Sequence, residues 1–247
     1  MTASPRSGAL VLAAGRGERM RPLTDTCPKP LLDVRGRPLI QWHLEALARG
    51  GVRDAVINTA WLGEQLPQRL GAGGEGSGMP RLHYSHEGID FGGALETAGG
   101  ISRALPVLDD VFWVVGGDVF MPGFAFSRDS LERFAAGHQI AHLWLVPNPA
   151  HNPRGDFGLS PDGLALNTAD GPRHTYSTVG LYRAAFFDEA RTGIAPGNAR
   201  GIAAPLAPLL RSAMDNGQVS AELYTGPWTD VGTPERLAQL NTQPDPA

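Results

Sequence analysis

Residues 8–17, GALVLAAGRG, decide the fold that this sequence predicts. Gly8 to Ala13 are continuously apolar, which is typical of a strand buried on both faces, and a glycine-rich turn follows at residues 15–17. Further along the chain, apolar strands alternate with helical patterns, and this alternation predicts a mainly parallel, doubly wound α/β sheet of the Rossmann type. Ligands bind at the carboxyl ends of the strands in such sheets, so the turn is the first candidate site.

The same pattern of apolar residues predicts the strands and helices in the rest of the chain. We expect further strands at 54–58, 81–85, 111–115, 142–146 and 219–224, with short strands around Phe157, Leu164 and Val179. We expect helices from Pro38, at 61–70, 97–105, 131–136 and 203–216, and from Pro234, with a flexible loop at 71–80. Beyond Asp118 the pattern becomes mixed, and no stretch is long enough to link two independent domains, so one domain over 1–247 is expected.

Composition narrows the class of protein. The 247 residues are 42% hydrophobic and 19% charged with a net charge of -4, which is typical of an ordinary globular enzyme and favours binding neither to nucleic acid nor to a membrane. A lone cysteine, Cys27, and the lack of a long apolar run predict a reduced, cytoplasmic setting. Of 21 basic residues only Lys29 is a lysine, which suggests a chemical need for its compact charge, and we expect that charge to be exposed.

Cations gather just after the first strand. Arg16, Arg19, Arg21 and Lys29 follow the glycine-rich turn, so backbone N–H groups and positive charges converge on one loop, as a polyphosphate requires. The spacing fits neither a P-loop nor a dinucleotide-binding turn, and a bare G-x-G is compatible with a plain tight turn.

The stretch LAAGRGERMRPLT at 12–24, with PKPL at 28–31, resembles the signature of the sugar-1-phosphate nucleotidyltransferases. These enzymes join a sugar phosphate to a nucleoside triphosphate and release pyrophosphate. The resemblance implies catalytic contacts from Arg19 and Lys29 to the phosphates. It also implies that the glycine-rich loop wraps the nucleotide through Ala13, Ala14, Gly15 and Gly17.

Two further segments resemble the metal site of that family. VFWVVGGDVF at 111–120 ends a buried strand with Asp118, and GPWTDVGTPERL at 226–237 carries Asp230. Both segments also have a purely structural interpretation. Gly-Asp after a strand is a common turn, and Thr233 followed by Pro234 is typical of the first residues of a helix. The resemblance implies that Asp118 and Asp230 together hold Mg²⁺. Gly117 departs from the asparagine that is frequent in the family.

LETAGG at 95–100 is similar to the family segment beside the nucleobase. Thr97 therefore has two compatible interpretations, a helix N-cap and a nucleotide contact. Glu87 precedes the segment. As a carboxylate it would accept a hydrogen bond from N3–H of uracil, or from N1–H and N2–H of guanine, but would not suit the acceptor N3 of cytosine; alternatively it is a solvated loop residue. The form with Glu in place of Gly resembles the uridylyltransferases that act on N-acetylmuramate α-1-phosphate in cell-wall recycling. Extra residues, GIDFGGA, stand at 88–94.

Sugar contacts are expected mainly from the second half. Arg154 would pair with the lactyl carboxylate of muramate and Asp156 would accept from sugar hydroxyls, with Gly155 between them, although an exposed arginine is also commonly just solvated. The resemblance carries over Asn58, Asn167 and Tyr176 as further sugar contacts.

These observations predict transfer of UMP from UTP to a sugar 1-phosphate, with a nucleotide-binding half at about 1–120 and a sugar-binding half at about 121–247. The partners expected are UTP and the sugar 1-phosphate, in a monomer or small homo-oligomer. The alternatives are a mannose-1-phosphate guanylyltransferase, a glucose-1-phosphate uridylyltransferase, and a non-catalytic regulatory subunit of the same fold. The first two usually carry an E-K-P element that this sequence lacks, and loss of Lys29 or of either aspartate would have favoured the third.

Overall fold

The centre of the molecule is the predicted first strand. The structure is a computed structural model that describes residues 6–168 and 171–242. Strand β1 (Ser7–Leu12) pairs in parallel with β4 (Asp54–Thr59) on one side and with β7 (Leu108–Gly116) on the other. Leu10 and Val11 are completely buried, because both faces of the sheet are covered by helices. The expected α/β fold is confirmed.

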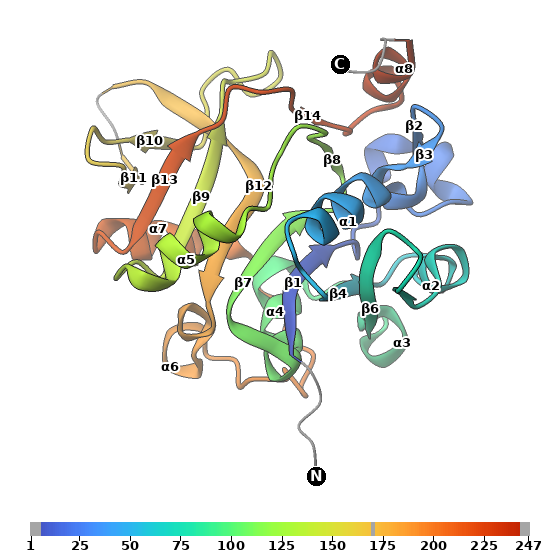
Figure 1. The fold of residues 1–247 in the computed structure, drawn as a ribbon, viewed down its shortest axis with the longest axis horizontal. Helices are drawn as coiled ribbons and strands as arrows, with labels where there is room; N and C mark the ends of the chain where they lie inside the picture. The colour runs from blue at the N-terminus through green and yellow to red at the C-terminus, as the bar shows by residue number, and fades with distance from the viewer. Residues whose placement is uncertain (1–5, 169–170, 243–247) are drawn as a thin grey trace.

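The order of the strands creates a switch point between β1 and β7. The chain runs from β1 through α1 (Leu39–Arg49) to β4 and through α2 (Gln65–Leu70) to β6 (Met79–His86), then returns through α4 (Glu96–Ala104) to β7. The sheet order is therefore β7-β1-β4-β6, and the chain moves away from β1 in opposite directions on its two sides (Figure 1). Ligands of α/β sheets bind at such a point, outside the carboxyl ends of the strands.

The second half extends the same sheet with antiparallel strands. The long strand β12 (Arg173–Arg183) pairs antiparallel with β7 and with β9 (Ala141–Val146), and β13 (Val219–Leu223) runs parallel to β9. Two short strands, β10 (Phe157–Leu159) and β11 (Ala165–Leu166), complete this edge. The predicted change from alternating to mixed structure is confirmed.

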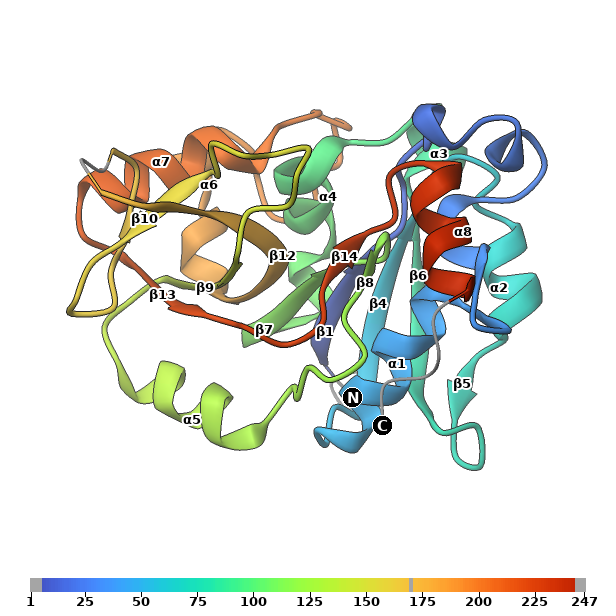
Figure 2. The ribbon, with the colours of Figure 1, turned by 90° about the horizontal axis from the view of Figure 1, so that it is seen from above.

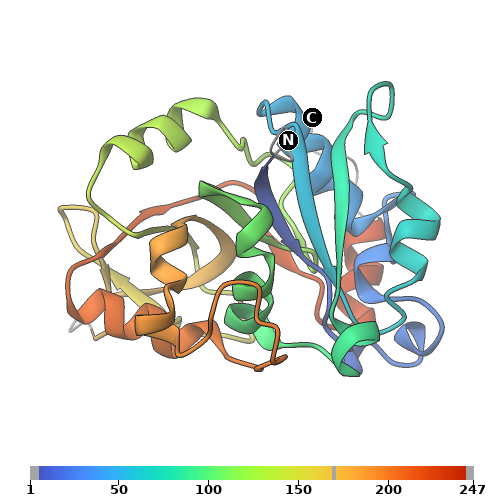
Figure 3. The ribbon, with the colours of Figure 1, turned by 90° about the horizontal axis from the view of Figure 1, so that it is seen from below.

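Helices cover both faces of the sheet (Figure 2). On one face, α4 and α7 (Leu206–Asp215) bury Ile101 and Leu210 against the strands. On the other, α1 buries Leu44 in the same cluster as Phe134 of α5 (Arg128–Ala136). Helix α8 (Pro234–Thr242) joins a smaller cluster that holds both Leu237 and Leu39, and Figure 3 shows the same layers from below.

Short elements complete the chain. They are the 3-10 helices Glu18–Met20, Leu23–Asp25, Lys29–Leu31, Leu105–Val107 and Ala184–Phe187, the helices α3 (Glu87–Phe91) and α6 (Glu189–Thr192), and the strands β2 (Asp33–Val34), β3 (Arg37–Pro38), β5 (Gly73–Gly74), β8 (Val119–Phe120) and β14 (Thr229–Asp230). The helix expected at 61–70 begins only at Gln65, because Leu62 has a left-handed backbone with φ of 49° that a helix does not continue. In the part of the chain that the structure describes, no helix is long and apolar enough to cross a membrane.

Candidate active site

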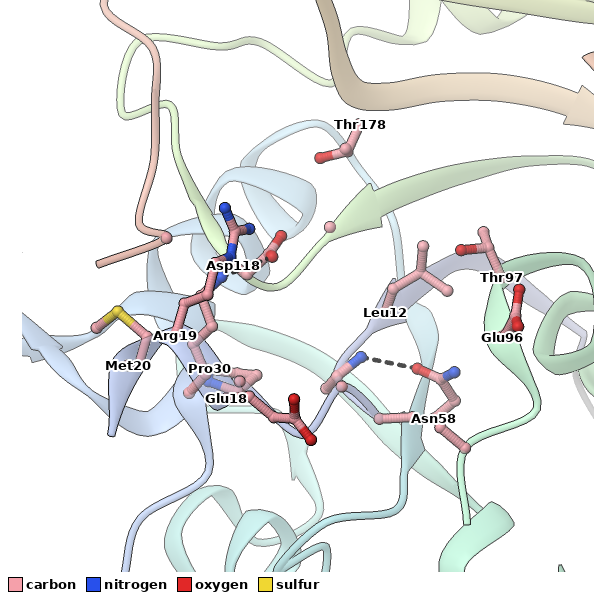
Figure 4. Close-up of a pocket in the computed structure, with 18 residues that line it drawn as sticks. Leu12, Glu18, Arg19, Met20, Pro30, Asn58, Glu96, Thr97, Asp118 and Thr178 are labelled. Carbon is pink, nitrogen blue, oxygen red and sulfur yellow. Dashed lines mark hydrogen bonds and ion pairs between the residues drawn. The ribbon is translucent and has the colours of Figure 1, made fainter. Parts of the chain in front are cut away.

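A cavity of about 590 Å³ opens at the switch point. The cavity is lined by the glycine-rich turn after β1, by Gly116 at the end of β7 with Asp118 just beyond it, and by Asn58 near the end of β4, so three neighbouring parallel strands place their carboxyl ends together (Figure 4). This is the location that strand order alone predicts for a ligand. The expected loop residues Ala13, Ala14, Gly15 and Gly17 are among its lining.

The shape of the glycine-rich turn is fixed by contacts with Thr24 and Trp61. Gly17 has a left-handed φ of 66°, and its carbonyl accepts a hydrogen bond of 2.8 Å from Thr24 Oγ1. The Arg16 guanidinium stacks 3.4 Å from the centre of the Trp61 ring and donates to the Thr24 carbonyl, so it anchors the loop from outside the cavity. Arg19 instead lines the cavity and is exposed, without an ion pair among the described residues. The loop therefore offers Arg19 and backbone to an anion.

Lys29 and Asp118 form an ion pair across the cavity wall. Lys29 Nζ lies 2.8 Å from Asp118 Oδ2, and the lysine side chain is 10% exposed whereas that of the aspartate is 46% exposed. The expectation of an exposed lysine is wrong, because the lysine stem is packed inside the loop and only its charge reaches the cavity. Gly117 N donates to Leu12 O, and a Cβ at Gly117 would lie 2.8 Å from that oxygen, which explains why glycine precedes Asp118 here.

Asp230 is brought beside Asp118 by a short ladder. Strand β14 pairs antiparallel with β8, and Val231 N donates to Asp118 O at 2.9 Å, so the two segments are hydrogen-bonded neighbours. The Asp230 carboxylate is paired with Arg236, and its Oδ1 lies 2.9 Å from His151 Nε2. The expected spatial pairing of the two carboxyl-bearing segments is confirmed.

The donor chemistry at these two aspartates fits a divalent cation. Asp118 uses only Oδ2 toward Lys29, and Asp230 Oδ1 is buried without a well-directed hydrogen bond. Hard carboxylate oxygens are the ligands that Mg²⁺ prefers, usually one or two of them together with phosphate oxygens and water. Among the described residues, no group of three or more His, Cys, Asp or Glu side chains could hold a metal without such help.

Asn58 and Glu87 form a buried bridge behind the cavity. Asn58 Oδ1 accepts from Ala13 N at 2.7 Å, and Asn58 Nδ2 donates to Glu87 Oε1 at 2.8 Å. The second oxygen of Glu87 accepts from Leu95 N at 2.8 Å, and burial raises the pKa of the Glu87 carboxyl. The expectation that Glu87 contacts the base is wrong, because the side chain is completely buried and both its oxygens are engaged. The bridge instead joins the glycine-rich turn to the start of α4.

Two residues that sequence reasoning missed line the same cavity. Glu96 and Thr178 have left-handed φ values of 56° and 64°, a conformation that costs a residue with a side chain about 1 kcal/mol. Thr178 stands where the pairing of β12 with β9 shifts register, and its Oγ1 is buried without a partner in the described chain. The glutamate in place of glycine at 96 was the available signal for the first; no sequence signal marked the second. Thr97 lines the cavity beside Glu96, as expected.

The residues expected to bind sugar are not gathered at this cavity. Arg154 is exposed, and Asp156 accepts from Asn152 Nδ2 and Tyr176 N, which closes its own loop. Gly155 has a left-handed φ of 62°, and a Cβ there would lie 2.7 Å from Asn148 Oδ1, so its glycine is a requirement of that loop.

Two of the residues expected to bind sugar have their polar groups engaged with other parts of the protein, so their sugar contacts stay predictions. The amide of Asn167 donates to Asp215 and accepts from Arg211, so α7 holds both its ends. The hydroxyl of Tyr176 bonds that of Tyr182 at 2.9 Å inside the core. Asn58 does line the cavity, but both ends of its amide bind protein atoms.

Comparisons with known proteins identify the family. Residues 8–160 match the family model described as nucleotidyl transferase, a stretch that includes Lys29 and Asp118. The chain is 48% identical over 238 residues to the N-acetylmuramate alpha-1-phosphate uridylyltransferase of Neisseria meningitidis, covering 94% of this chain and 95% of that protein. It is 32% identical over 219 residues to the Caulobacter vibrioides protein of the same name, covering 76% and 88%.

A solved structure agrees on the fold. A Bacillus anthracis protein assigned as a glucose-1-phosphate thymidylyltransferase superposes with a TM-score of 0.74 at 20% identity, covering 96% of this chain and 94% of that one. The glycine-rich turn, Lys29 and the position of Asp118 at the switch point thus coincide with the matched family stretch. This chain belongs to the nucleotidyl transferase family.

Proposed function

We propose that this protein transfers the uridylyl group from UTP to N-acetylmuramate α-1-phosphate and releases pyrophosphate. The convergence of Arg19, Lys29 and Asp118 on one cavity supports the reaction class. The names of the Neisseria and Caulobacter relatives support the substrates. In this assignment the nucleotide occupies the half formed by about residues 1–120 and the sugar the half formed by about 121–247.

The reaction needs alignment more than acid–base chemistry. A phosphate oxygen of the sugar 1-phosphate attacks the α-phosphorus of UTP, a new P–O bond forms, and the bond from that phosphorus to the bridging oxygen of pyrophosphate breaks. The attacking oxygen is already ionised near neutral pH, so no side chain has to remove a proton. The role of the protein is to hold the two phosphates in line and to stabilise the charge that develops on the leaving group.

Each candidate residue has a role in that scheme. Arg19, exposed in the cavity, and Lys29 Nζ neutralise the β- and γ-phosphates as they leave. Backbone N–H groups of the glycine-rich turn bind the same oxygens. Members of the family generally use a divalent metal, and we assign Mg²⁺ to Asp118 and Asp230, where it supplies positive charge shared between the phosphates when bound.

Muramate differs from other sugars of this class by a lactyl carboxylate. Arg154 is exposed on the loop that carries His151, and His151 reaches Asp230. We assign Arg154 to the lactyl carboxylate, because a guanidinium binds a carboxylate through two hydrogen bonds. The reaction consumes UTP, so we expect the protein to act in the cytoplasm.

Pyrophosphate release tests the proposal directly. The assay pairs UTP, CTP, GTP and dTTP with the α-1-phosphates of N-acetylmuramate, N-acetylglucosamine, glucose and mannose, with Asp118→Asn as the matched inactive control. The expected result is the highest kcat/KM for UTP with N-acetylmuramate α-1-phosphate. Preference for glucose or mannose 1-phosphate would contradict the substrate assignment, and absence of release from every pair would contradict the reaction class.

A further inference from the structure

The two aspartates of the candidate metal site are not equally accessible. Asp118 lines the cavity, and its side chain is 46% exposed. Asp230 is not among the described residues that line the cavity, although Gly232, two positions further on, is one of them. The Oδ1 atom of Asp230 is buried from solvent. A cation in the cavity can therefore reach Asp118 directly, whereas the free oxygen of Asp230 is covered by another group.

A histidine from the second half of the chain covers that oxygen. His151 Nε2 lies 2.9 Å from Asp230 Oδ1, whereas the other carboxylate oxygen, Oδ2, is held by Arg236. Arg236 Nη1 also donates to the Asp230 carbonyl at 3.0 Å and lies 3.3 Å from the same imidazole nitrogen. Arg236 thus fixes one side of the carboxylate, and His151 closes the other.

The covering side chain is only lightly attached. His151 stands near the tip of the loop formed by residues 147–156, between β9 and β10, and its side chain is 38% exposed. Its contact with Asp230 Oδ1 has the distance of an ion pair but not the direction of a good hydrogen bond. Among the described residues, its polar contacts are those with Asp230 and Arg236. His151 can therefore leave the carboxylate without opening the core.

The base of the same loop is anchored, which confines movement to its tip. Asn148 Nδ2 donates to the carbonyl of Arg173 at 2.9 Å, and Asp156 Oδ2 accepts from Tyr176 N at 2.8 Å. Both ends of the loop are therefore tied to β12. Arg154 lies between these anchors and is exposed, so it belongs to the same short tip as the histidine.

The imidazole and a hard divalent cation compete for the same oxygen. Mg²⁺ binds carboxylate oxygens at about 2.0–2.1 Å and keeps several waters in its remaining positions. Mg²⁺ and Mn²⁺ prefer oxygen ligands, whereas imidazole suits metals such as Zn²⁺ and Cu²⁺. A nitrogen at 2.9 Å from Asp230 Oδ1 occupies the space that the cation and its water need. Asp230 can therefore hold His151 or a hydrated hard cation, but not both.

We propose that His151 is a latch on Asp230, which it leaves when Oδ1 takes up a divalent cation, and that its departure frees the tip of loop 147–156. The inference rests on the metal site of the proposed function. The tip also carries Arg154, the residue assigned to the lactyl carboxylate, so the state of Asp230 and the position of this arginine are coupled. Because such coupling is reciprocal, whatever holds the tip away from Asp230 strengthens metal binding.

Mn²⁺ binding measures the latch without turnover. Mn²⁺ is titrated into the protein with α,β-methylene-UTP, whose bridge between the α- and β-phosphorus atoms is not broken by transfer, and free Mn²⁺ is followed by electron paramagnetic resonance. His151→Ala should lower the Kd for Mn²⁺ about fivefold, the effect of removing one competing polar contact. In an Asp230→Asn background the same substitution should change the Kd by less than about twofold, because the oxygen under competition no longer belongs to a carboxylate.

Hydrogen exchange reports the movement of the tip. Amide exchange in residues 149–153 of the wild type should become at least about threefold faster when Mn²⁺ is added, because the tip loses its contact with Asp230. Asp230→Asn should exchange at the same rate with and without Mn²⁺. His138→Ala is the matched control, since it removes another exposed histidine that lies outside the loop. It should leave both the Kd and the exchange rate at their wild-type values.

The contrary results are specific. A higher Kd in His151→Ala would make His151 a metal ligand, and an unchanged Kd would make it a passive cover; both overturn the inference. Exchange that slows or stays constant on addition of Mn²⁺ would also overturn it. A wild type that binds no Mn²⁺ would remove the metal from the proposed function and the inference with it, whereas binding with an unchanged Kd in the variant removes the inference alone. An equal Tm checks that His151→Ala is folded, and His151→Gly provides a second measurement of the same Kd.

Discussion

The Asn58–Glu87 bridge gives the sharpest test of how the site is built. Asn58→Asp keeps the acceptor for Ala13 N but replaces the donor to Glu87 with a second carboxylate oxygen at the same 2.8 Å separation. Two unit charges at that distance repel by about 6 kcal/mol at an effective dielectric constant of about 20. The pair avoids this by binding one proton, which costs about 1.4 kcal/mol for each pH unit above the ordinary carboxyl pKa of about 4.

Proton uptake is the cheaper route near neutrality, so it sets the size of the effect. The shared carboxyl has a folded-state pKa above its unfolded value, hence its contribution to stability is present at low pH and is lost as pH rises. We expect Asn58→Asp to lower the free energy of unfolding by about 4 kcal/mol at pH 7 and by about 1 kcal/mol at pH 5. Urea unfolding followed by tryptophan fluorescence at pH 5, 6 and 7 measures both values.

A second substitution provides the matched control. When Asn58→Asp is combined with Glu87→Gln, the glutamine amide N–H donates to the carboxylate introduced at position 58, and the glutamine carbonyl accepts from Leu95 N. Every hydrogen bond of the bridge is then restored with donor and acceptor exchanged, so the double variant should recover most of the stability lost at pH 7. A destabilisation that does not change with pH, or a double variant as unstable as the sum of its single substitutions, would refute the bridge as described.

Three other predictions follow from single contacts. Lys29→Met should reduce kcat/KM at least about tenfold, because a charged contact to phosphate is lost. The free energy of unfolding should change by less than about 1 kcal/mol, because Asp118 is nearly half exposed and water can solvate it without its partner. An unchanged kcat/KM would contradict a phosphate contact by Lys29. Burial lowers the pKa of His43 to about 4, and its Nε2 contacts Val119 O, so the unfolded state takes up a proton first as pH falls. The free energy of unfolding should therefore fall by about 2 kcal/mol between pH 7 and pH 5, relative to the His43→Gln variant. The same dependence of stability on pH in both proteins would exclude a buried, neutral His43. Thr178→Val should raise the unfolding free energy of the ligand-free protein by about 1 kcal/mol, because the substitution removes a buried hydroxyl that has no partner among the described residues. A lower Tm in the variant would mean that the Thr178 hydroxyl makes a hydrogen bond.

Sequence reasoning located the site but not the details of its walls. The apolar run before Gly15 and the strand before Asp118 sufficed to place both residues at one sheet edge, because parallel strands share the direction of their carboxyl ends. Glu87 could not be placed, since a carboxylate in a short connecting segment has no periodicity that marks it as buried. The partners of Asn167 could not be foreseen, because Arg211 and Asp215 lie on a helix far away in sequence and such long-range contacts leave no local signal.

The ladder between β8 and β14 also has a consequence for biosynthesis. It joins Val119 to Asp230, so the wall of the site that carries Asp230 forms only after the segment around Asp230 has left the ribosome, more than a hundred residues after Val119. The parallel strands β1, β4 and β7 are complete by Gly116 and already contain the glycine-rich turn and Lys29 between them. A chain that stops before Asp230 therefore retains the glycine-rich turn, Lys29 and Asp118 but lacks Asp230, and the charged groups around the cavity are assembled in two separate stages of translation.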